Sequence, residues 1–486
     1  MGCTTLLVGK KASYDGSTMI ARTDDGFFDV KKTVVINPED QKKIYKSVIG
    51  HLEIELPDNP MRYTCSPSVN PVHGIWAAGG INEANVGMSA TETITTNPLV
   101  LGADPYVRYQ KKEGRKPGKA GGLGEEDFVV VVLPYIRSAR EGVIRLGSLL
   151  EQYGTYESNG IAFNDENEIW WLETIGGHHW IAKKVKDEEY VIMPNRQGID
   201  SFDLNDALKE QKEHMCSSDL KEFIEKNHLD LNQDGTCNPR LIFGSHSDAD
   251  HIYNNPRAWY IGRYFNPTGI KWEGENADYT PESDNIPWSF VPERKITAED
   301  VKHILSSYYQ GTPYNPYLKT ESPKRGIYRP IGISRTGVTH ICQIRSDVPD
   351  EIKGIQWITY GCNAFNAAVS LYTNVTKMPK YVSDVKSDVS TGNFYWASRM
   401  IEALADAHYG PCIQHVERYQ SAVSAGCHRI MNEYDRKMKE TGDYSLCDEA
   451  NKKICEMLKK ETDAALKRIL QTASEHMKSG YSRADN

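Results

Sequence analysis

The cysteines of this chain form none of the patterns by which metal sites are recognised. The 486 residues include 10 cysteines, irregularly placed, without a CxxC pair or a Cys/His spacing of the zinc-ligand type. No stretch approaches the roughly 20 apolar residues that cross a bilayer, and the start lacks a charged and then apolar signal segment. We therefore expect reduced thiols, no membrane partner and a cytoplasmic location.

The chain also lacks an excess of positive charge and the glycine motifs that bind phosphate. The formal net charge is −9, whereas general nucleic-acid binding relies on clustered Lys and Arg, so we expect no nucleic-acid partner. The glycines form neither GxGxxG nor a Walker loop, which argues against a nucleotide cofactor. The apolar fraction of 39% and the charged fraction of 25% are those of an ordinary globular enzyme.

Short apolar, β-branched runs separated by turns predict a largely antiparallel sheet structure. The first run covers 3–9, and a turn at 14–17 leads into a second run at 18–22, which predicts a hairpin. Further strands are expected at 32–37, 74–78, 86–91, 158–164, 168–174, 179–185, 190–193, 326–344 and 354–360.

Apolar residues at three- and four-residue steps predict helices between the strands and at the end of the chain. The expected helices are 126–139, 142–153, 393–408, 411–441 and 447–478. The Lys- and Gly-rich stretch 111–124 has no such period, so we expect an exposed loop or lid. We thus expect an α+β fold, with a catalytic domain at 3–390 and a helical extension at 391–486 that packs on the same domain.

Cys3 is the most informative residue for chemistry. The predicted hairpin returns Arg22, Asp24 and Asp25 to the neighbourhood of Cys3. A thiol becomes a good nucleophile when a base takes its proton or when positive charge lowers its pKa, and Arg22 can supply that charge. A free α-amine, with an ordinary pKa of about 7.7–8.0, can act as the base. A cysteine at the first position of a chain therefore carries its own base, and Asp25 can orient that amine.

The motifs of the chain resemble one known family along most of its length. They are Cys3-Thr4-Thr5-Leu6-Leu7-Val8-Gly9, Asp15-Gly16-Ser17-Thr18, Arg22-Thr23-Asp24-Asp25, the stretches 80–93 and 160–177, Pro194-Asn195-Arg196 and His246-Ser247-Asp248-Ala249-Asp250. They resemble the dipeptidase A-type peptidases, which are cysteine N-terminal-nucleophile (Ntn) hydrolases related to bile salt hydrolases and penicillin V acylases. The resemblance implies the Ntn-hydrolase fold, a four-layer αββα sandwich of two mostly antiparallel sheets.

The resemblance also implies a set of catalytic residues. Cys3 matches the nucleophile, Arg22 the arginine beside the thiol and Asp25 the carboxylate that holds the α-amine. Asn82 and Asn195 match oxyanion-hole positions, and Arg335 matches an arginine that completes the site. The family's self-processing implies that Met1 and Gly2 are removed, Gly2 by attack of the thiol on its carbonyl, and that no metal or organic cofactor is needed.

A dipeptidase must also recognise both ends of a short substrate. We expect Glu92 and Glu173 to bind the substrate amine, and we expect a homo-oligomer. Three alternatives remain open: an acylase of the bile-salt or penicillin V type, a non-catalytic binding protein resembling the secernins, and a metallopeptidase. The last rests on His246, Asp248, Asp250 and His251, although a capped turn is the better explanation of that run. A turn is likewise the better explanation of 230–235, which resembles the first half of a calcium loop.

Overall fold

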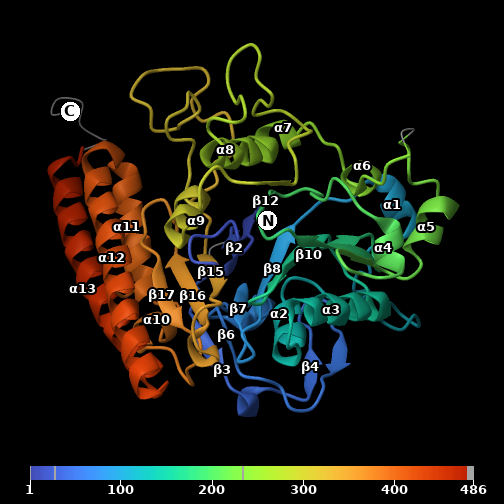
Figure 1. The fold of residues 1–486 in the computed structure, drawn as a ribbon, viewed down its shortest axis with the longest axis horizontal. Helices are drawn as coiled ribbons and strands as arrows, with labels where there is room; N and C mark the ends of the chain where they lie inside the picture. The colour runs from blue at the N-terminus through green and yellow to red at the C-terminus, as the bar shows by residue number, and fades with distance from the viewer. Residues whose placement is uncertain (1, 27–28, 233–234, 479–486) are drawn as a thin grey trace.

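Two antiparallel sheets form the centre of the molecule, as the α+β expectation requires. The computed structural model describes residues 2–26, 29–232 and 235–478 (Figure 1). Within these ranges the larger sheet has seven strands, in the order β14-β12-β1-β2-β15-β16-β17, and the second has six, in the order β13-β11-β10-β9-β8-β7. All of the pairings between these strands are antiparallel.

The strands have the following bounds. In the seven-stranded sheet they are β14 (Ser289–Phe290), β12 (Tyr190–Met193), β1 (Thr4–Val8), β2 (Thr18–Asp24), β15 (Val338–Ile344), β16 (Gly354–Tyr360) and β17 (Val369–Tyr372). In the six-stranded sheet they are β13 (His214–Cys216), β11 (His179–Val185), β10 (Ile169–Ile175), β9 (Asn159–Asn164), β8 (Gly87–Thr93) and β7 (Gly79–Ile81). Two small ribbons pair β3 (Val34–Ile36) with β6 (Tyr63–Cys65) and β4 (Ile44–Lys46) with β5 (Glu53–Glu55).

The helices pack around the two sheets, most of the long ones on the outer faces and several short ones against the core between the sheets. They are α1 (Pro98–Ala103), α2 (Phe128–Val132), α3 (Ala139–Tyr153), α4 (Leu204–Leu208), α5 (Leu220–Lys226), α6 (Pro239–Phe243), α7 (Asp250–Tyr253), α8 (Asn255–Phe265), α9 (Ala298–Leu305), α10 (Lys380–Ser383), α11 (Phe394–Ala407), α12 (Tyr409–Thr441) and α13 (Leu446–Glu475). Short 3-10 helices occur at Pro38–Asp40, Pro71–His73, Leu133–Tyr135 and Asp350–Ile352.

Alternation along the strands explains the layering, because successive side chains of a strand point to opposite faces. Leu7 and Ile20 belong to a core that also contains Ala162 and Trp171 of the other sheet. Leu6 and its neighbours on the opposite face pack with α8, α9 and α11 to α13. The outer face of the six-stranded sheet packs with α2 and α3. The described residues therefore stack as helices, sheet, sheet and helices.

Most elements confirm the sequence-based expectations, and the differences have local causes. The expected helix 126–139 is broken: α2 ends at Val132, and a 3-10 turn containing Pro134 precedes α3. The expected strand 326–344 begins only at Val338, because Pro330 and Gly332 keep the preceding segment in a loop. The expected strand at 74–78 is displaced to β7. Of the expected exposed loop 111–124, residues 111–120 are exposed and contain no helix or strand, but residues 121–124 are buried, because their backbone amides pair with Gly50, Val107 and Gly154.

Candidate active site

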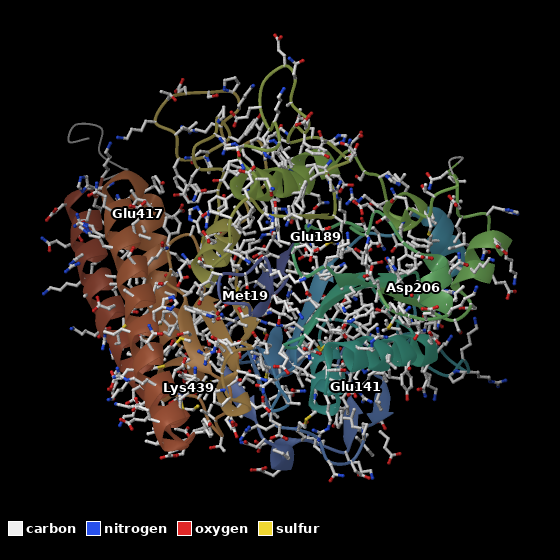
Figure 2. All side chains as sticks on the ribbon, viewed as in Figure 1. Met19, Glu141, Glu189, Asp206, Glu417 and Lys439 are labelled. Carbon is white, nitrogen blue, oxygen red and sulfur yellow. The ribbon has the colours of Figure 1, made fainter. Side chains whose placement is uncertain are left out.

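Cys3 lies at the beginning of the first strand and is almost completely buried, with 1% of its surface exposed. The β1–β2 hairpin pairs Thr5 with Arg22, so the guanidinium returns to the beginning of β1. Arg22 Nη1 donates to Cys3 Sγ over 3.1 Å. Met19, labelled in Figure 2, marks the same strand β2 near the middle of the molecule. The sequence-predicted Cys3 and Arg22 are thus brought together between the two sheets.

The guanidinium of Arg22 is held in one position by the facing sheet. Nη2 donates to Ala78 O at 3.1 Å and to Ala90 O at 2.7 Å. Nη1 also donates to Thr91 O at 2.7 Å and to Glu125 Oε1 at 3.1 Å. These four acceptors fix the cation with its positive charge directed at the thiol.

Burial controls the protonation of the thiol in this arrangement. It raises the pKa of Cys3 well above its ordinary value of 9.0, although the charge of Arg22 acts in the opposite direction. Glu92 and Glu125 raise the pKa further. The thiol is therefore neutral at pH 7, and a base must take its proton when sulfur attacks.

Asp25 connects the end of β2 to the residue that precedes Cys3. Its Oδ2 accepts from Thr23 Oγ1 at 3.0 Å and from Arg329 Nη2 at 2.6 Å, and its Oδ1 accepts from Thr336 Oγ1 at 2.7 Å. Arg329 Nη2 also donates to the carbonyl oxygen of Gly2. In this form of the chain, in which Gly2 is still attached, Asp25 acts through Arg329 on the peptide group ahead of Cys3.

Asn195 lies in a polar cluster on the other side of the thiol residue. Arg257 Nη2 donates to Asn195 Oδ1 at 2.7 Å, and Arg257 Nη1 donates to the carbonyl oxygen of Cys3. The amide of Asn195 donates to Glu92 Oε1 at 2.7 Å and to Thr93 O at 2.8 Å. The cluster orders Asn195 beside the first strand, with both amide hydrogens engaged.

The glutamates expected to bind the substrate amine are buried parts of the framework. Glu92 also accepts from Thr5 Oγ1 at 2.8 Å, and burial raises its pKa to about 8. Glu173 Oε1 accepts from Trp171 Nε1 at 2.9 Å and from the Gly198 amide at 2.8 Å, and burial raises the pKa of Glu173 to about 7. Glu173 therefore anchors the loop that follows Asn195, and neither carboxyl is open to solvent.

Asn82 is placed where its donors are already engaged. Its amide donates to Leu133 O at 2.8 Å and to Ile136 O at 2.7 Å, and its backbone N–H donates to Val86 O at 3.0 Å. Its Oδ1 accepts from the amides of Ala84 and Val86. The structure brings none of these donors to Cys3; Asn82 ties a turn to the end of the α2 segment instead.

Arg335 lies at the outer edge of the site. It is exposed, and its Nη2 donates to Tyr253 Oη at 3.2 Å. Tyr253 in turn lies beside Gly2, and the guanidinium carbons of Arg257 and Arg329 are each 5.1 Å from the centre of its ring. Arg335 is thereby linked to the rest of the cluster through one phenol oxygen.

The acidic groups near the thiol include one set with the spacing of metal ligands. Among the described residues, only Cys3, Asp24 and Glu125 offer three ligand atoms within 4.8 Å of one another. Arg22 Nη1 lies within 4.0 Å of a ligand atom of each, so the guanidinium supplies the positive charge that these groups share. The thiol and the two carboxylates therefore surround the guanidinium of Arg22.

The two runs of the sequence that resemble metal-binding motifs, 246–251 and 230–235, make hydrogen bonds and ion pairs within the protein. Asp250 accepts from the Ser247 amide at 3.3 Å and from Asn254 Nδ2 at 2.5 Å, so it belongs to the turn that leads into α7, whose N-cap Ala249 has no side-chain cap. His251 pairs with Asp284 at 3.1 Å. In the second run Asp230 accepts from the Asn232 amide at 2.9 Å, while residues 233 and 234 lie outside the described part of the chain.

Sequence reasoning missed three residues of the cluster: Tyr253, Arg257 and Arg329. Tyr253 and Arg257 flank Asn254-Asn255-Pro256, which reads as a turn, and Arg329 lies in a segment expected to be a strand. Arg257 Nη2 also donates to Asn254 Oδ1 at 2.7 Å. The available sequence signal was the run of Asn, Pro and Arg at the beginning of α8. A fully buried arginine requires polar partners such as these asparagines.

Comparison with known proteins places the chain in a family. The family model "Peptidase family C69" matches residues 2–422. A dipeptidase of Bifidobacterium longum is 49% identical over the whole of both chains. A probable dipeptidase A of Streptococcus pyogenes is 48% identical, also over the whole of both chains. Dipeptidase A of Lactobacillus helveticus is 44% identical over 95% of this chain and 94% of its own. The matches confirm the resemblance: the chain belongs to peptidase family C69.

Proposed function

We propose that this peptidase hydrolyses dipeptides with Cys3 as an N-terminal nucleophile, after Met1 and Gly2 have been removed. The three relatives, a dipeptidase, a probable dipeptidase A and a dipeptidase A, support the choice of substrate. The stack of helices, two antiparallel sheets and helices supports the Ntn-hydrolase fold, in which the nucleophile begins the first strand. Met1 itself lies outside the described residues.

One observation carries the proposal: the buried thiol of Cys3 receives a hydrogen bond from Arg22 over 3.1 Å at the beginning of β1. Because burial keeps the thiol protonated, the base must be close by and poorly solvated. The α-amine of Cys3 itself meets that need once Gly2 has left. Arg329, which donates to the Gly2 carbonyl, would then face this amine and favour its neutral, basic form.

The reaction follows from these positions. The amine accepts the thiol proton while sulfur attacks the scissile carbonyl, and Arg22 stabilises the thiolate as it forms. The second amino acid leaves with that proton, and a thioester remains on Cys3. Water, activated by the same amine, then hydrolyses the thioester. Residues of the chain carry every step.

Asn195 is the oxyanion donor of this proposal. Its amide is held beside Cys3 by Arg257, and donation to the oxyanion requires it to release either Glu92 Oε1 or Thr93 O. Asn82 is not used, because its amide donates to Leu133 O and Ile136 O and its backbone N–H donates to Val86 O. Arg335, exposed at the rim, is the cation best placed to attract the carboxylate of a dipeptide.

Substitution of the nucleophile tests the proposal. Cys3→Ala should abolish dipeptide hydrolysis while far-UV circular dichroism stays that of the folded protein, and Cys3→Ser should leave at most a small residual rate. A panel containing dipeptides, a bile-salt conjugate and penicillin V separates the dipeptidase from the acylase alternative. Activity that resists iodoacetamide but disappears with EDTA would establish the metallopeptidase alternative instead.

A further inference from the structure

The space around Gly2 is shaped for a residue without a side chain. Gly2 is buried, and its carbonyl oxygen accepts from Arg329 Nη2. A Cβ added to Gly2 would lie 1.9 Å from Tyr253 Oη, 2.9 Å from Cζ and 3.1 Å from Cε1. Real Cβ atoms essentially never approach other atoms within 3.0 Å, so any larger residue must displace the tyrosine.

Tyr253 is held too firmly to move aside at little cost. The guanidinium carbons of Arg257 and Arg329 each lie 5.1 Å from the centre of its ring. Its Oη accepts from Arg335 Nη2 at 3.2 Å, and its backbone carbonyl accepts from Arg257 Nε at 2.7 Å. A shift of the phenol away from position 2 would disturb contacts to all three arginines.

We propose that Tyr253 restricts the residue ahead of Cys3 to glycine during self-removal, while Arg329 holds the carbonyl that the thiol attacks. This specificity rests on the proposed function, since it concerns the step that exposes the amine of Cys3. Tyr253 acts as a specificity-determining residue: it sets which residue fits against the nucleophile. Arg329 positions the carbonyl and can stabilise the oxygen as it becomes negative.

The removal of Gly2 requires no reactant other than water. Sulfur of Cys3 bonds to the Gly2 carbonyl carbon, the bond from that carbon to the Cys3 nitrogen breaks, and the thiol proton passes to this nitrogen. Water then breaks the new carbon–sulfur bond, adding hydroxyl to the glycine carbonyl and returning a proton to sulfur. The products are a free carboxyl on the released glycine and Cys3 with a free amine and thiol.

Alanine at position 2 is the sharpest probe, because it adds only the methyl group that meets Tyr253. We expect Gly2→Ala to slow the appearance of protein beginning at Cys3 by about tenfold to a hundredfold, the range that an overpacked contact implies. The measurement is a time course of intact mass on the full chain after a pulse of synthesis. It separates chains that begin at Cys3 from those that retain residue 2.

A double-mutant cycle isolates the role of the tyrosine. The rate ratio between glycine and alanine at position 2 is measured in the parent and in the Tyr253→Phe background, where the closest atom is gone. We expect the ratio to shrink about tenfold or more. Tyr264→Phe, which removes a hydroxyl bonded to Asp300 at 2.9 Å in α9, is the matched control and should leave the ratio unchanged.

The outcomes separate this inference from the proposed function. Equal maturation of the Gly2→Ala and parent chains, or a ratio that Tyr253→Phe does not change, would overturn the role of Tyr253 alone. A parent protein that hydrolyses dipeptides at full rate with Gly2 still attached would overturn the proposed function, and this inference with it.

Discussion

At the scale of single residues, the guanidinium of Arg22 makes a set of hydrogen bonds that a lysine ammonium cannot make. One guanidinium donates to three carbonyls, a carboxylate and the thiol of Cys3 from a fully buried position. An ammonium group has three donors without the planar fork, so it can satisfy only part of this set. The arginine therefore supplies both the charge at the nucleophile and part of the connection between the two sheets.

Replacement of Arg22 by lysine should consequently damage both stability and catalysis. We expect Arg22→Lys to lose at least about 1–3 kcal/mol of unfolding free energy, the cost of one buried acceptor left without its donor, and most dipeptide hydrolysis. Urea unfolding and initial rates measure the two effects. Arg263→Lys, at a part-exposed pair with Glu273 at 2.8 Å, is the control and should change stability by less than about 1 kcal/mol. Wild-type behaviour of Arg22→Lys would contradict this view of the site.

Substitutions of the two asparagines expected to form the oxyanion hole should have different effects, one on catalysis and the other on stability. We expect Asn195→Ala to lower kcat by about 100- to 1,000-fold, the usual effect of losing one oxyanion donor. Asn82→Ala should instead lower the melting temperature with a smaller effect on kcat, because it leaves Leu133 O and Ile136 O without their donor. Kinetics and thermal unfolding of both variants test this, and the reverse pattern would restore Asn82 to the catalytic site.

The residues near the hairpin could be predicted from sequence, and the distant ones could not. Cys3, Arg22 and Asp25 lie on one short hairpin, whose register follows from local pattern alone. Arg257 and Arg329 reach the same point from more than 250 residues away along the chain, which no local pattern encodes. The charge of Glu92 and Glu173 suggests contact with the substrate amine, whereas the structure buries both carboxyls completely, which no local pattern indicates.

At the scale of elements, the loop after β12 is held by one buried carboxyl. Glu173 on β10 accepts from the backbone amides of Gly198 and Ile199, and its Oε2 has no partner. Burial raises its pKa from the ordinary value of 4.5 to about 7. The folded state therefore binds this proton more tightly than the unfolded state does, and stability from Glu173 falls as pH rises from about 4.5 through about 7.

Glu173→Gln should remove this pH dependence while keeping an acceptor for the two amides. We expect the unfolding free energy of the parent to fall relative to that of the variant as the pH rises from 4.5 to 8. The relative change should be on the order of 3 kcal/mol. Urea unfolding across pH measures it. Glu213→Gln, at an exposed position before β13, is the control, and parallel curves for Glu173→Gln and the parent would refute the assignment.

The boundaries of an element could be predicted where the spacing of its apolar residues continues without interruption. The long helices α12 and α13 agree with expectation within a few residues, because their apolar spacing continues to a left-handed Gly442 and beyond. The segment 326–337 resembles a strand in sequence, but its apolar and β-branched residues line a loop that carries Arg329 and Arg335. Short helices such as α7 depend on tertiary contacts and leave little sequence signal.

At the scale of the whole molecule, the C-terminal helices complete the core of the catalytic part. Figure 1 shows α11, α12 and α13 side by side against the strands β16 and β17. Val416, Val423 and Ile430 of α12 belong to the same core as Leu6 and Met19 of the central strands. No helix within the described residues has the length and apolar content needed to span a membrane. The division at residue 390, the homo-oligomer and the cytoplasmic location stay predictions.

Removal of the helical extension should therefore prevent folding. We expect a chain of residues 1–390 to be aggregated or unfolded, because the outer face of the seven-stranded sheet would lose its cover. Circular dichroism and size-exclusion chromatography measure this outcome. Replacement of the exposed loop 112–118 by glycine and serine is the control and should keep the fold. A folded, active 1–390 chain would show that the extension is a separate domain.

The central claim is that the working enzyme begins at Cys3 and reacts through that sulfur. Intact mass and peptide mapping of fully active protein, before and after inactivation by iodoacetamide, test it most directly. The account predicts a chain beginning at Cys3, with one adduct on this residue formed in proportion to the activity lost. Full activity in protein that retains Gly2, or in protein whose Cys3 is already alkylated, would contradict it.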